Sequence, residues 1–360
     1  MKVLHISDYG ESKLNGIYSS VSRLAEEQRS LGVIVKEGMV TPHQSIIDNC
    51  LKFNVKTFKQ YKALVRSFAP DIIIFNGLYP YQQILFSWFA NRKSIPYIIV
   101  YHGGASKDNA KKRFVKKKIA NFFFWNRFIE KAKAVVYLNQ SEYVKSVFKK
   151  QNGKFYIIPN GIDIPNSLNC PVTKSKINVC FVSRMDYKGK GLDVLFKVIE
   201  ELKIEFWNNR VQFSFYGGQY DETPNILKKY GDYAKYYGFV SGKAKEKAYR
   251  NADVLILPSR SEGMPMCVLE ALSYGVPCIV TPQTNMADII YEHKCGWVST
   301  LNVDSLKQSI KDAYADISKN KVQYFLNCRN VIKLFAWSKV ANSTIEMYKE
   351  IIESNRHERR

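Results

Sequence analysis

Two glutamates, Glu262 and Glu270, stand with seven residues between them in the stretch SRSEGMPMCVLEALSYGVP, directly after the apolar run ADVLILP. Glu262 lies among Ser, Gly and Pro, where the chain must turn, and Glu270 lies inside a helical pattern. Pro265 fits the first turn of that helix. The backbone N–H groups at its start belong to Gly263, Met264 and Met266. A carboxylate here either interacts with the helix dipole or accepts hydrogen bonds from adjacent hydroxyls, as a ribose diol or a sugar ring requires.

A second group of residues could bind phosphate. Arg184 ends the run INVCFVSR, Lys190 and Gly191 follow six and seven residues later, and a helix is expected to begin near Asp193. Two cations at a strand-to-helix turn, beside free backbone N–H groups, form a phosphate site, because the guanidinium fork can grip two oxygens. A solvated basic loop is the alternative, and Lys188 competes with Lys190 for the role.

Length and charge limit what these residues can belong to. A chain of 360 residues predicts two domains of similar size, and 46% hydrophobic and 24% charged residues are typical of a folded globular protein. The net charge is +22: residues 1–165 carry 26 Lys and Arg against 11 Asp and Glu, or +15, and residues 166–360 carry 28 against 21, or +7. This bias predicts an anionic partner for the first half, such as a membrane surface, a nucleic acid or an acidic substrate.

Cysteines and apolar runs bear on the compartment. The seven cysteines are an odd number without any C-x-x-C, so we expect free thiols in a reducing cytosol rather than disulfides or a zinc site. The start MKVLHISDYG reads as a strand and a turn, not a signal peptide. No run approaches the roughly 18 to 20 apolar residues of a membrane span. We therefore expect a cytoplasmic protein, attached at most to a membrane face.

Short apolar runs alternate with helical patterns, which predicts parallel α/β sheets. The expected strands lie in 2–7, 33–40, 71–77, 96–103, 134–139 and 154–161, and then in 177–184, 211–218, 233–240, 252–259, 277–281 and 296–300. Residues 16–32 predict a helix that Gly32 closes. The fold class is therefore α/β, with two Rossmann-like doubly wound domains in tandem. Ligands of such sheets bind beyond the carboxyl ends of the strands.

The combined motifs resemble a known family. Arg184 with Lys190-Gly191, followed by the Glu-x7-Glu stretch, is similar to the retaining nucleotide-sugar glycosyltransferases of family 4, glycosyl transferases group 1 of the bacterial surface-polysaccharide type, which have the GT-B fold. IPNGID (159–164) resembles the family's interdomain segment, VYHGG (100–104) its central His loop, and WSKVANSTIEMYKEI (337–351) its C-terminal crossing helix. The likeness covers essentially the whole chain in order.

The resemblance implies a domain organisation. Residues 1–165 should form an N-terminal acceptor domain and residues 166–176, within a stretch rich in turn formers, a linker. Residues 177–338 should form the nucleotide-sugar donor domain. Residues 339–360 should form a helix that packs back on the N-terminal domain.

The resemblance also implies roles for single residues. Arg184 and Lys190 should bind the donor diphosphate, Glu270 the ribose hydroxyls, and Glu262 the hydroxyls of the transferred sugar. The backbone amides of Gly263, Met264 and Met266 should assist. Pro265, which has no N–H, belongs to the same donor-binding segment. His102 should line the sugar and acceptor side, although a histidine at a strand end is often only a structural hydrogen bonder.

Two further positions follow from the resemblance. Gly16 matches the glycine that lets the backbone approach the diphosphate at a helix N-terminus, although Asn15 replaces the first glycine of the family's usual pair. The backbone near Phe239 and Val240 should meet the base, and an ordinary strand end is the alternative.

The expected mechanism uses no metal. No Asp-x-Asp occurs in the chain, so Arg184, Lys190 and helix N-termini would stabilise the leaving group by preorganised electrostatics. The resemblance implies retention of configuration by same-face attack, with the departing phosphate helping to deprotonate the acceptor. We identify no covalent nucleophile and expect no cofactor beyond the nucleoside-diphosphate sugar.

Residues 107–133 bear on the acceptor. The segment begins with seven Lys and Arg and one Asp up to Lys118, and then turns aromatic. A basic amphipathic helix with Phe and Trp is typical of a membrane-surface segment. The alternative is a solvated helix whose residues 122–125 pack on the sheet. A lipid-linked saccharide acceptor at the inner face of the plasma membrane would require the first interpretation.

The sequence thus predicts a retaining glycosyltransferase that uses a nucleoside-diphosphate sugar, with UDP-sugars favoured and GDP-sugars possible. Its acceptor would be a lipid-linked glycan of lipopolysaccharide, O-antigen, capsule or exopolysaccharide synthesis. A nucleotide-sugar epimerase of the same fold is an alternative. A basic nucleic-acid-binding protein is another, but no recognition module is visible and the paired glutamates would be unexplained. A dehydrogenase is disfavoured because no Gly-x-Gly-x-x-Gly follows the first strand.

Overall fold

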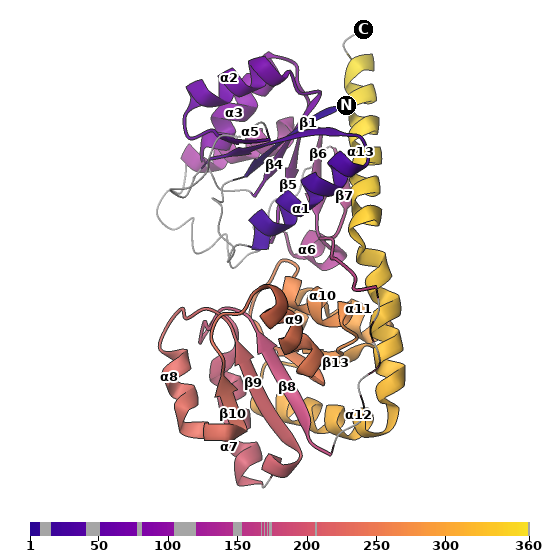
Figure 1. The fold of residues 1–360 in the computed structure, drawn as a ribbon. Helices are drawn as coiled ribbons and strands as arrows, with labels where there is room; N and C mark the ends of the chain where they lie inside the picture. The colour runs from indigo at the N-terminus through magenta and orange to yellow at the C-terminus, as the bar shows by residue number, and fades with distance from the viewer. Residues whose placement is uncertain are drawn as a thin grey trace. The chain divides into compact units, whose positions relative to one another are not determined.

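The computed structural model describes residues 1–7, 16–40, 51–77, 81–103, 120–146, 153–166, 175–205 and 207–358, with the single residues 168, 170 and 172. The chain divides into two compact units (Figure 1). The first comprises Met1–Gly161 with Trp337–Arg360, and the second comprises Ile162–Ala336. The boundaries expected from the sequence, at 165 and 338, lie a few residues further along the chain.

The first unit contains a parallel sheet with the order β3-β2-β1-β4-β5-β6-β7 among its described strands. These strands are β1 (Lys2–Ser7), β2 (Ile34–Met39), β3 (Lys52–Asn54), β4 (Ile72–Asn76), β5 (Tyr97–Val100), β6 (Ala134–Tyr137) and β7 (Lys154–Ile157). The order reverses direction between β1 and β4, which is the arrangement of a doubly wound sheet.

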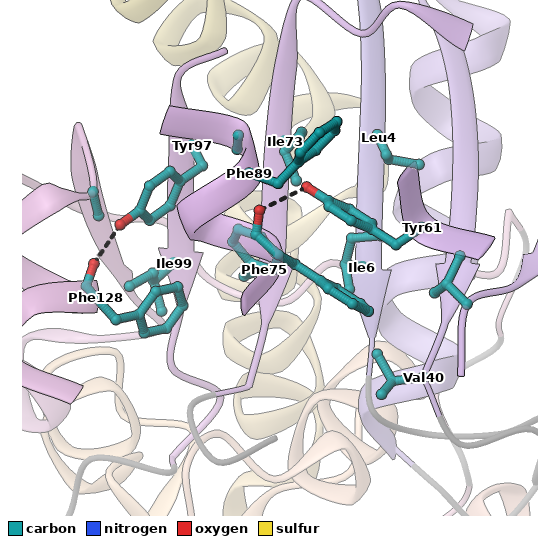
Figure 2. Close-up of a cluster of buried hydrophobic side chains, with 14 of the residues drawn as sticks. Leu4, Ile6, Val40, Tyr61, Ile73, Phe75, Phe89, Tyr97, Ile99 and Phe128 are labelled. Carbon is teal, nitrogen blue, oxygen red and sulfur yellow. Dashed lines mark hydrogen bonds between the residues drawn. The ribbon is translucent and has the colours of Figure 1, made fainter. Parts of the chain in front are cut away.

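Helices cover both faces of this sheet. They are α1 (Gly16–Ser30), α2 (Phe58–Phe68), α3 (Tyr81–Arg92), α5 (Ala120–Lys131), α6 (Gln140–Lys145) and α13 (Trp337–His357). On one face, α2, α3 and α5 enclose an aromatic core (Figure 2). The Tyr61 ring stacks 4.0 Å from that of Phe86 and donates its hydroxyl to the Phe86 carbonyl, and Tyr97 donates likewise to Phe128.

The C-terminal helix α13 belongs to the first unit, beside its sheet (Figure 1). Its buried side chains Val340, Ile345 and Tyr348 join the core on the second face of the sheet. The amide nitrogen of Gln28, on α1, donates to the Thr344 hydroxyl at 2.9 Å. Apolar packing and this buried hydrogen bond therefore join α1 and α13, although more than 300 residues separate them.

The second unit contains a parallel sheet with the order β10-β9-β8-β11-β12-β13 among its described strands. These strands are β8 (Ile177–Val182), β9 (Val211–Tyr216), β10 (Ala234–Tyr236), β11 (Val254–Leu257), β12 (Cys278–Val280) and β13 (Gly296–Val298). Its α-helices are α7 (Leu192–Ile204), α8 (Thr223–Leu227), α9 (Gly242–Asn251), α10 (Met266–Ser273), α11 (Ala287–Glu292) and α12 (Val303–Val331). Short 3-10 helices lie at Trp207–Asn209, Lys228–Tyr233, Pro282–Thr284 and Ile332–Phe335.

The predicted fold class is confirmed: both sheets are parallel and doubly wound. Each predicted strand segment contains a strand, and α1 ends just before Gly32, whose φ of 82° suits a helix stop. The sequence missed β3, which has only three residues and therefore no usable periodicity.

Cys170, Cys180, Cys267, Cys278, Cys295 and Cys328 are free thiols. Within the described residues, no helix is both long and apolar enough to pass through a lipid bilayer.

A buried ion pair fixes α12 to the sheet of the second unit. The Lys321 ammonium lies 2.6 Å from Asp253 Oδ1 and donates to the Val172 carbonyl at 3.0 Å. The other Asp253 oxygen accepts the Asn178 backbone N–H at 2.8 Å. Both charged side chains are almost fully buried, so each depends on the other for its charge to be compensated.

Replacing Lys321 by Met should lower the free energy of unfolding by about 3 kcal/mol, because it leaves the Asp253 carboxylate buried without its cation. Urea unfolding followed by circular dichroism measures this change. Lys319→Met, at an exposed position of the same helix, is the matched control and should change stability by less than about 0.5 kcal/mol. Equal effects of the two substitutions would contradict this account of the pair.

Candidate active site

Residues 184–191, which follow β8, lie tightly against the end of β11. Gly191 has a φ of 68°, and a Cβ atom built on it would lie 2.0 Å from the carbonyl oxygen of Pro258. Any other residue would therefore clash with backbone as well as adopt a disfavoured conformation. The backbone N–H of Arg260 donates to the Gly189 carbonyl at 3.0 Å, which joins the two loops again.

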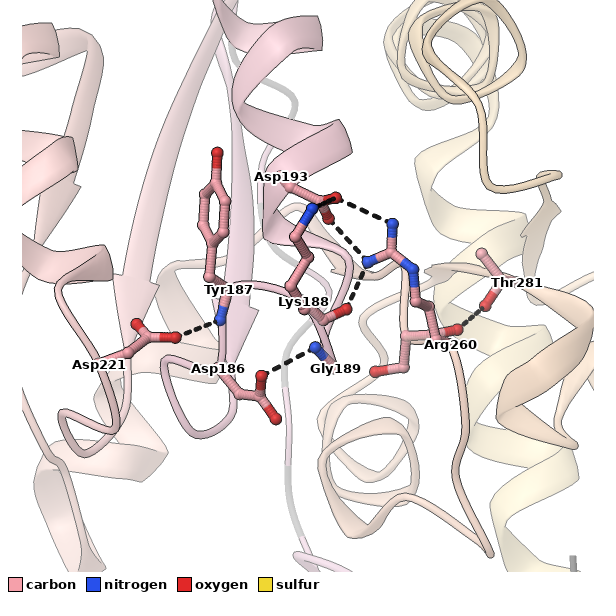
Figure 3. Close-up of polar contacts among 9 residues, drawn as sticks. Asp186, Tyr187, Lys188, Gly189, Asp193, Asp221, Arg260 and Thr281 are labelled. Carbon is pink, nitrogen blue, oxygen red and sulfur yellow. Dashed lines mark hydrogen bonds and ion pairs between the residues drawn. The ribbon is translucent and has the colours of Figure 1, made fainter. Parts of the chain in front are cut away.

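A bidentate ion pair reinforces this contact (Figure 3). The two terminal nitrogens of Arg260 lie 2.7 and 2.9 Å from the two oxygens of Asp193, at the start of α7. Arg260 also donates to the Lys188 carbonyl. Burial favours the protonated form of Asp193, but Arg260 and Lys188 outweigh it and lower the pKa of this carboxyl. Asp193 therefore remains charged and holds Arg260 across the two loops.

Two further carboxylates shape residues 184–191, Asp186 from the loop itself and Asp221 from the segment after β9 (Figure 3). Asp221 accepts the Tyr187 backbone N–H at 2.7 Å, and Asp186 accepts that of Gly189 at 2.8 Å. These bonds use backbone donors that a turn would otherwise leave to water. The loop is thereby fixed at several points along its length.

The loop directs Lys190 toward one of the predicted carboxylates. The Lys190 ammonium lies 2.5 Å from Glu262 Oε1, and both side chains are mostly buried, with 13% and 14% exposed. The Ser259 hydroxyl donates to the same oxygen at 2.7 Å. Lys188, the competing cation, is 77% exposed and faces Asp193 instead. The structure therefore brings Lys190, and not Lys188, beside Glu262.

Arg184 lies at the start of the same loop, where β8, β9 and β10 end. Its guanidinium lies over the Tyr220 ring, 5.2 Å from the centroid, and its side chain is exposed. A Cβ on Gly217 would lie 1.7 Å from the Ser183 carbonyl oxygen, and the Gly217 N–H donates to Gly238. Loops from three neighbouring strands thus meet beside Arg184.

The segment after Glu262 is held by Asn285, which the sequence did not single out. The Asn285 side-chain amide donates to the backbone carbonyls of Glu262 and Gly263, at 2.8 and 3.2 Å. Met264 is buried, and α10 begins at Met266.

The expected position of Pro265 was wrong by one residue. It is the N-cap of α10, with a ψ of 116°, rather than part of the first turn. An extended backbone at this position carries the chain from the Glu262 loop into the helix. The N–H of Val268 donates back to the Pro265 carbonyl, as the first bond of the helix.

Glu270 lies in the middle of α10 with two partners. Its Oε1 is 2.5 Å from the Lys245 ammonium, and its Oε2 accepts the Tyr249 hydroxyl at 2.6 Å. The two predicted carboxylates are therefore each paired with a different lysine, Glu262 with Lys190 and Glu270 with Lys245.

Cys267 lies between the two ion pairs in the chain. Burial, followed by the charge of Glu262, raises the pKa of its thiol to about 12, although Lys190 and Lys245 oppose this. The thiol remains protonated near neutral pH, so it cannot act as a thiolate nucleophile.

The predicted base contact lies at the carboxyl end of β10. Val240 is half-buried there, Phe239 is 49% exposed, and Gly238 turns the chain with a φ of 76°. The structure places this segment one loop away from Arg184, since Gly238 bonds to Gly217.

In the first unit, the predicted His102 lies in a turn after β5. It has a φ of 48°, which is uncommon outside glycine, and Gly103 follows with 77°. The His102 Nε2 atom lies 3.2 Å from Asn76 Oδ1. The buried Glu142 carboxylate accepts the N–H of Gly103 at 2.6 Å and that of Leu138 at 2.7 Å. The end of β4, through Asn76, and α6, through Glu142, thus hold this strained turn.

A polar chain continues from His102 into the unit. Asn76 contacts His5 at 3.4 Å, and His5 Nε2 lies 3.0 Å from the Gln28 amide oxygen. His5, Asn76 and His102 line a pocket together with residues of α1 and α13, including Trp337. Burial, followed by the electrostatic effect of neighbouring His5, lowers the pKa of His102 from 6.5 to about 4. Its imidazole is therefore neutral near pH 7.

Other predictions fall partly or wholly outside the described residues. Gly16 is the exposed first residue of α1, with no atom within 4 Å of a Cβ built on it, and Asn15 lies outside the described part. Of the segment 107–133, residues 107–119 lie outside it. In α5, Trp125 packs in the aromatic core while Phe124 is 57% exposed, so the membrane and packing interpretations both keep support.

Comparison with known proteins decides the family. The description Glycosyltransferase Family 4 matches residues 16–165, and Glycosyl transferases group 1 matches residues 176–316. The two matches follow each other and span most of the chain. The chain belongs to glycosyltransferase family 4.

Curated relatives of this glycosyltransferase agree with the family. An uncharacterised glycosyltransferase of Methanocaldococcus jannaschii is 27% identical over 59% of this chain and 58% of its own length. A putative colanic acid biosynthesis glycosyltransferase of Escherichia coli K12 is 23% identical over 46% of this chain and 47% of its own length. The chain thus spans about half the length of these relatives.

Solved structures show the GT-B fold of this glycosyltransferase. Sucrose-phosphate synthase from Thermosynechococcus elongatus has a TM-score of 0.78 at 16% identity, with 98% of this chain and 99% of that chain covered. WaaG, a glycosyltransferase involved in lipopolysaccharide biosynthesis, has a TM-score of 0.71 at 14% identity, with 96% and 99% covered. HepE from Anabaena in complex with UDP has a TM-score of 0.73 at 13% identity, with 97% and 100% covered.

Sequence reasoning missed the partners of the predicted residues. In the sequence, Arg260 stands two residues before Glu262, and Asp193 stands at the start of an expected helix. Nothing in the sequence indicates that Arg260 and Asp193 form a pair. The same holds for Asn285 and for the α9 pair of Lys245 and Tyr249. Helical spacing places the last two on one face, which is the only signal that could have found them.

The lowered pKa of His102 predicts a loss of stability in acid. The unfolded histidine titrates near its ordinary 6.5 and the folded one near 4, so unfolding takes up a proton between these values. The free energy of unfolding should therefore be highest above the upper value and fall toward the lower one, and His102→Gln should lessen this fall. Urea unfolding at both ends of the window measures it. His293→Gln, at an exposed histidine, should keep the wild-type dependence; an unchanged slope in His102→Gln would contradict the assignment.

Proposed function

We propose that this glycosyltransferase moves a sugar, with retention of configuration, from a nucleoside-diphosphate sugar to a glycan acceptor. The observation that carries the proposal is the close pair of Lys190 and Glu262, 2.5 Å apart where the loops after β8 and β11 meet. Ligands of doubly wound sheets bind at such strand ends. A donor of this class needs a cation for its phosphates and an acid for its sugar hydroxyls at neighbouring points.

The contacts of Lys190 and Glu262 leave each of them able to bind its part of the donor. An ammonium has three donors, so Lys190 can keep Glu262 and still donate to a phosphate. Because Lys190 and Ser259 both bond to Oε1 of Glu262, Oε2 is available to accept sugar hydroxyls. Arg184, held over Tyr220 at the start of the same loop, would add a guanidinium fork for the diphosphate.

The proposed reaction needs charge stabilisation more than a nucleophile. The bond between the anomeric carbon and the phosphate oxygen breaks as the acceptor hydroxyl attacks the same face. The hydroxyl proton passes to the departing phosphate, whose charge Arg184 and Lys190 stabilise. We propose that this occurs without a metal, because these cations supply the charge and the sequence has no Asp-x-Asp.

Donor and acceptor are proposed by analogy and charge. HepE was solved in complex with UDP, and starch synthase IV from Arabidopsis thaliana was solved bound to ADP and acarbose, which supports a nucleoside diphosphate here, with UDP favoured. The names of the colanic acid and lipopolysaccharide enzymes support a surface-polysaccharide acceptor. The charge of +15 on residues 1–165 supports a lipid-linked acceptor on an anionic membrane face, with the protein in the cytoplasm.

A screen of UDP-, GDP- and ADP-sugars tests the proposal. Thermal shift should identify one base, and that donor should support transfer to lipid-linked oligosaccharides with retained anomeric configuration. EDTA should leave the rate unchanged if no metal takes part. Formation of an isomerised nucleotide sugar without an acceptor would identify an epimerase instead, and failure of every donor would overturn the proposal.

Arg184→Ala and Glu270→Ala should each reduce transfer by at least about a hundredfold, because each removes a charged contact to the donor. Both variants should retain the wild-type circular dichroism spectrum. Lys188→Ala is the matched control for Arg184, since Lys188 is a highly exposed cation of the same loop, and it should keep most of the activity. Near-wild-type turnover in either test variant would refute the site.

A further inference from the structure

The environment of Glu270 contains more than the proposed function requires. A ribose-binding carboxylate needs only to reach the hydroxyls, yet Glu270 has a cation on one oxygen and a hydroxyl donor on the other. Lys245 lies 2.5 Å from Oε1, and Tyr249 donates to Oε2 at 2.6 Å. The side chain of Glu270 is nevertheless 21% exposed, so a ligand can reach the carboxylate.

Both partners come from one face of α9. Lys245 and Tyr249 are four residues apart in this helix, so their side chains are neighbours. Tyr249 is almost fully buried, and its ring stacks on that of Tyr274 at 5.6 Å with an interplanar angle of 13°. Burial and the nearby charge of Glu270 raise the pKa of its hydroxyl. Tyr249 is therefore a rigid and permanently protonated donor.

The Glu270 carboxylate keeps hydrogen-bond acceptor sites that a ligand can use. A carboxylate has about four lone-pair sites, two on each oxygen. Lys245 occupies a site on Oε1 and Tyr249 a site on Oε2, which leaves capacity on both oxygens. Two hydroxyls on adjacent carbons can use one site each. Because its two partners fix the rotation of the carboxylate group, the remaining sites point in fixed directions.

We propose that Lys245 and Tyr249 are positioning residues that orient Glu270 to recognise a vicinal diol, the 2′- and 3′-hydroxyls of the donor ribose. The inference rests on the proposed function, since it deepens the role of Glu270. It adds that discrimination between a ribose and a sugar without these hydroxyls depends on α9. The positioning residues do not themselves touch the donor.

A merely structural ion pair would behave differently. A partly exposed pair contributes little to stability, so loss of Lys245 should change the melting temperature only slightly. If Lys245 contacted the phosphates directly, its loss would weaken the binding of every nucleotide equally. Orientation of Glu270 predicts instead that the loss falls on ligands that carry the diol. The preference for ribose over dideoxyribose therefore separates the three roles.

The experiment measures dissociation constants by calorimetry for UDP, GDP and ADP, each beside its 2′,3′-dideoxy form. The wild type should bind its preferred nucleotide at least about tenfold more tightly than the dideoxy form, because two hydrogen bonds to a carboxylate are lost. Lys245→Met and Tyr249→Phe should each reduce this preference about threefold or more, mainly through weaker binding of the ribose form. Lys245→Arg should keep the wild-type preference for the ribose form. Lys243→Met, at an exposed position of the same helix, should also leave this preference unchanged.

A background without the carboxylate completes the test. In Glu270→Gln the preference should be largely lost, and adding Lys245→Met should cause no further loss, because both act through one group. An unchanged preference in Lys245→Met, or equal weakening of ribose and dideoxy forms, would overturn the inference while nucleotide binding by the wild type still supports the proposed function. If the wild type binds none of the six nucleotides, the proposed function fails and the inference fails with it.

Discussion

The close approach of Gly191 to the Pro258 carbonyl is the constraint on which the geometry of the proposed donor site depends. No side chain fits between the two backbones, and the left-handed conformation of Gly191 turns the loop into α7 at that point. The loops after β8 and β11 therefore meet directly. Arg260 then joins them by its bidentate pair with Asp193, so that Lys190 and Glu262 meet as a consequence of backbone packing.

Charge pairing explains how a strongly basic chain places two carboxylates near a helix start. Each is held by a lysine from a different loop or helix, so neither is an uncompensated charge. The Lys245–Glu270 pair is partly exposed, and such a pair contributes modestly to stability. The larger effect of both pairs is directional, since a paired carboxylate presents its remaining lone pairs in defined directions. Glu262 and Glu270 thereby gain the orientation that the proposed recognition of hydroxyls requires.

In the first unit, neighbouring side chains likewise hold His102 in a fixed backbone conformation. His102 adopts a left-handed conformation that costs free energy for a residue with a Cβ, and it persists only where the surroundings determine it. Asn76 and Glu142 supply that determination through the imidazole and the Gly103 amide. Burial keeps the imidazole neutral, so His102 can donate or accept a hydrogen bond but carries no charge at neutral pH.

The sequence by itself determined the element types, because β-rich apolar runs and glycine stops are local signals. It also predicted which loops hold the candidate site residues, since charged residues directly after buried strands must lie at the carboxyl edge of a parallel sheet. It could not detect β3, which is too short for a periodic pattern. Tertiary structure alone decided that Lys190 rather than Lys188 faces Glu262, 72 residues away, and that Lys245 and Tyr249 hold Glu270. These pairings depend on strand order and on how closely loops pack, and neither is encoded in the spacing of residues within one segment.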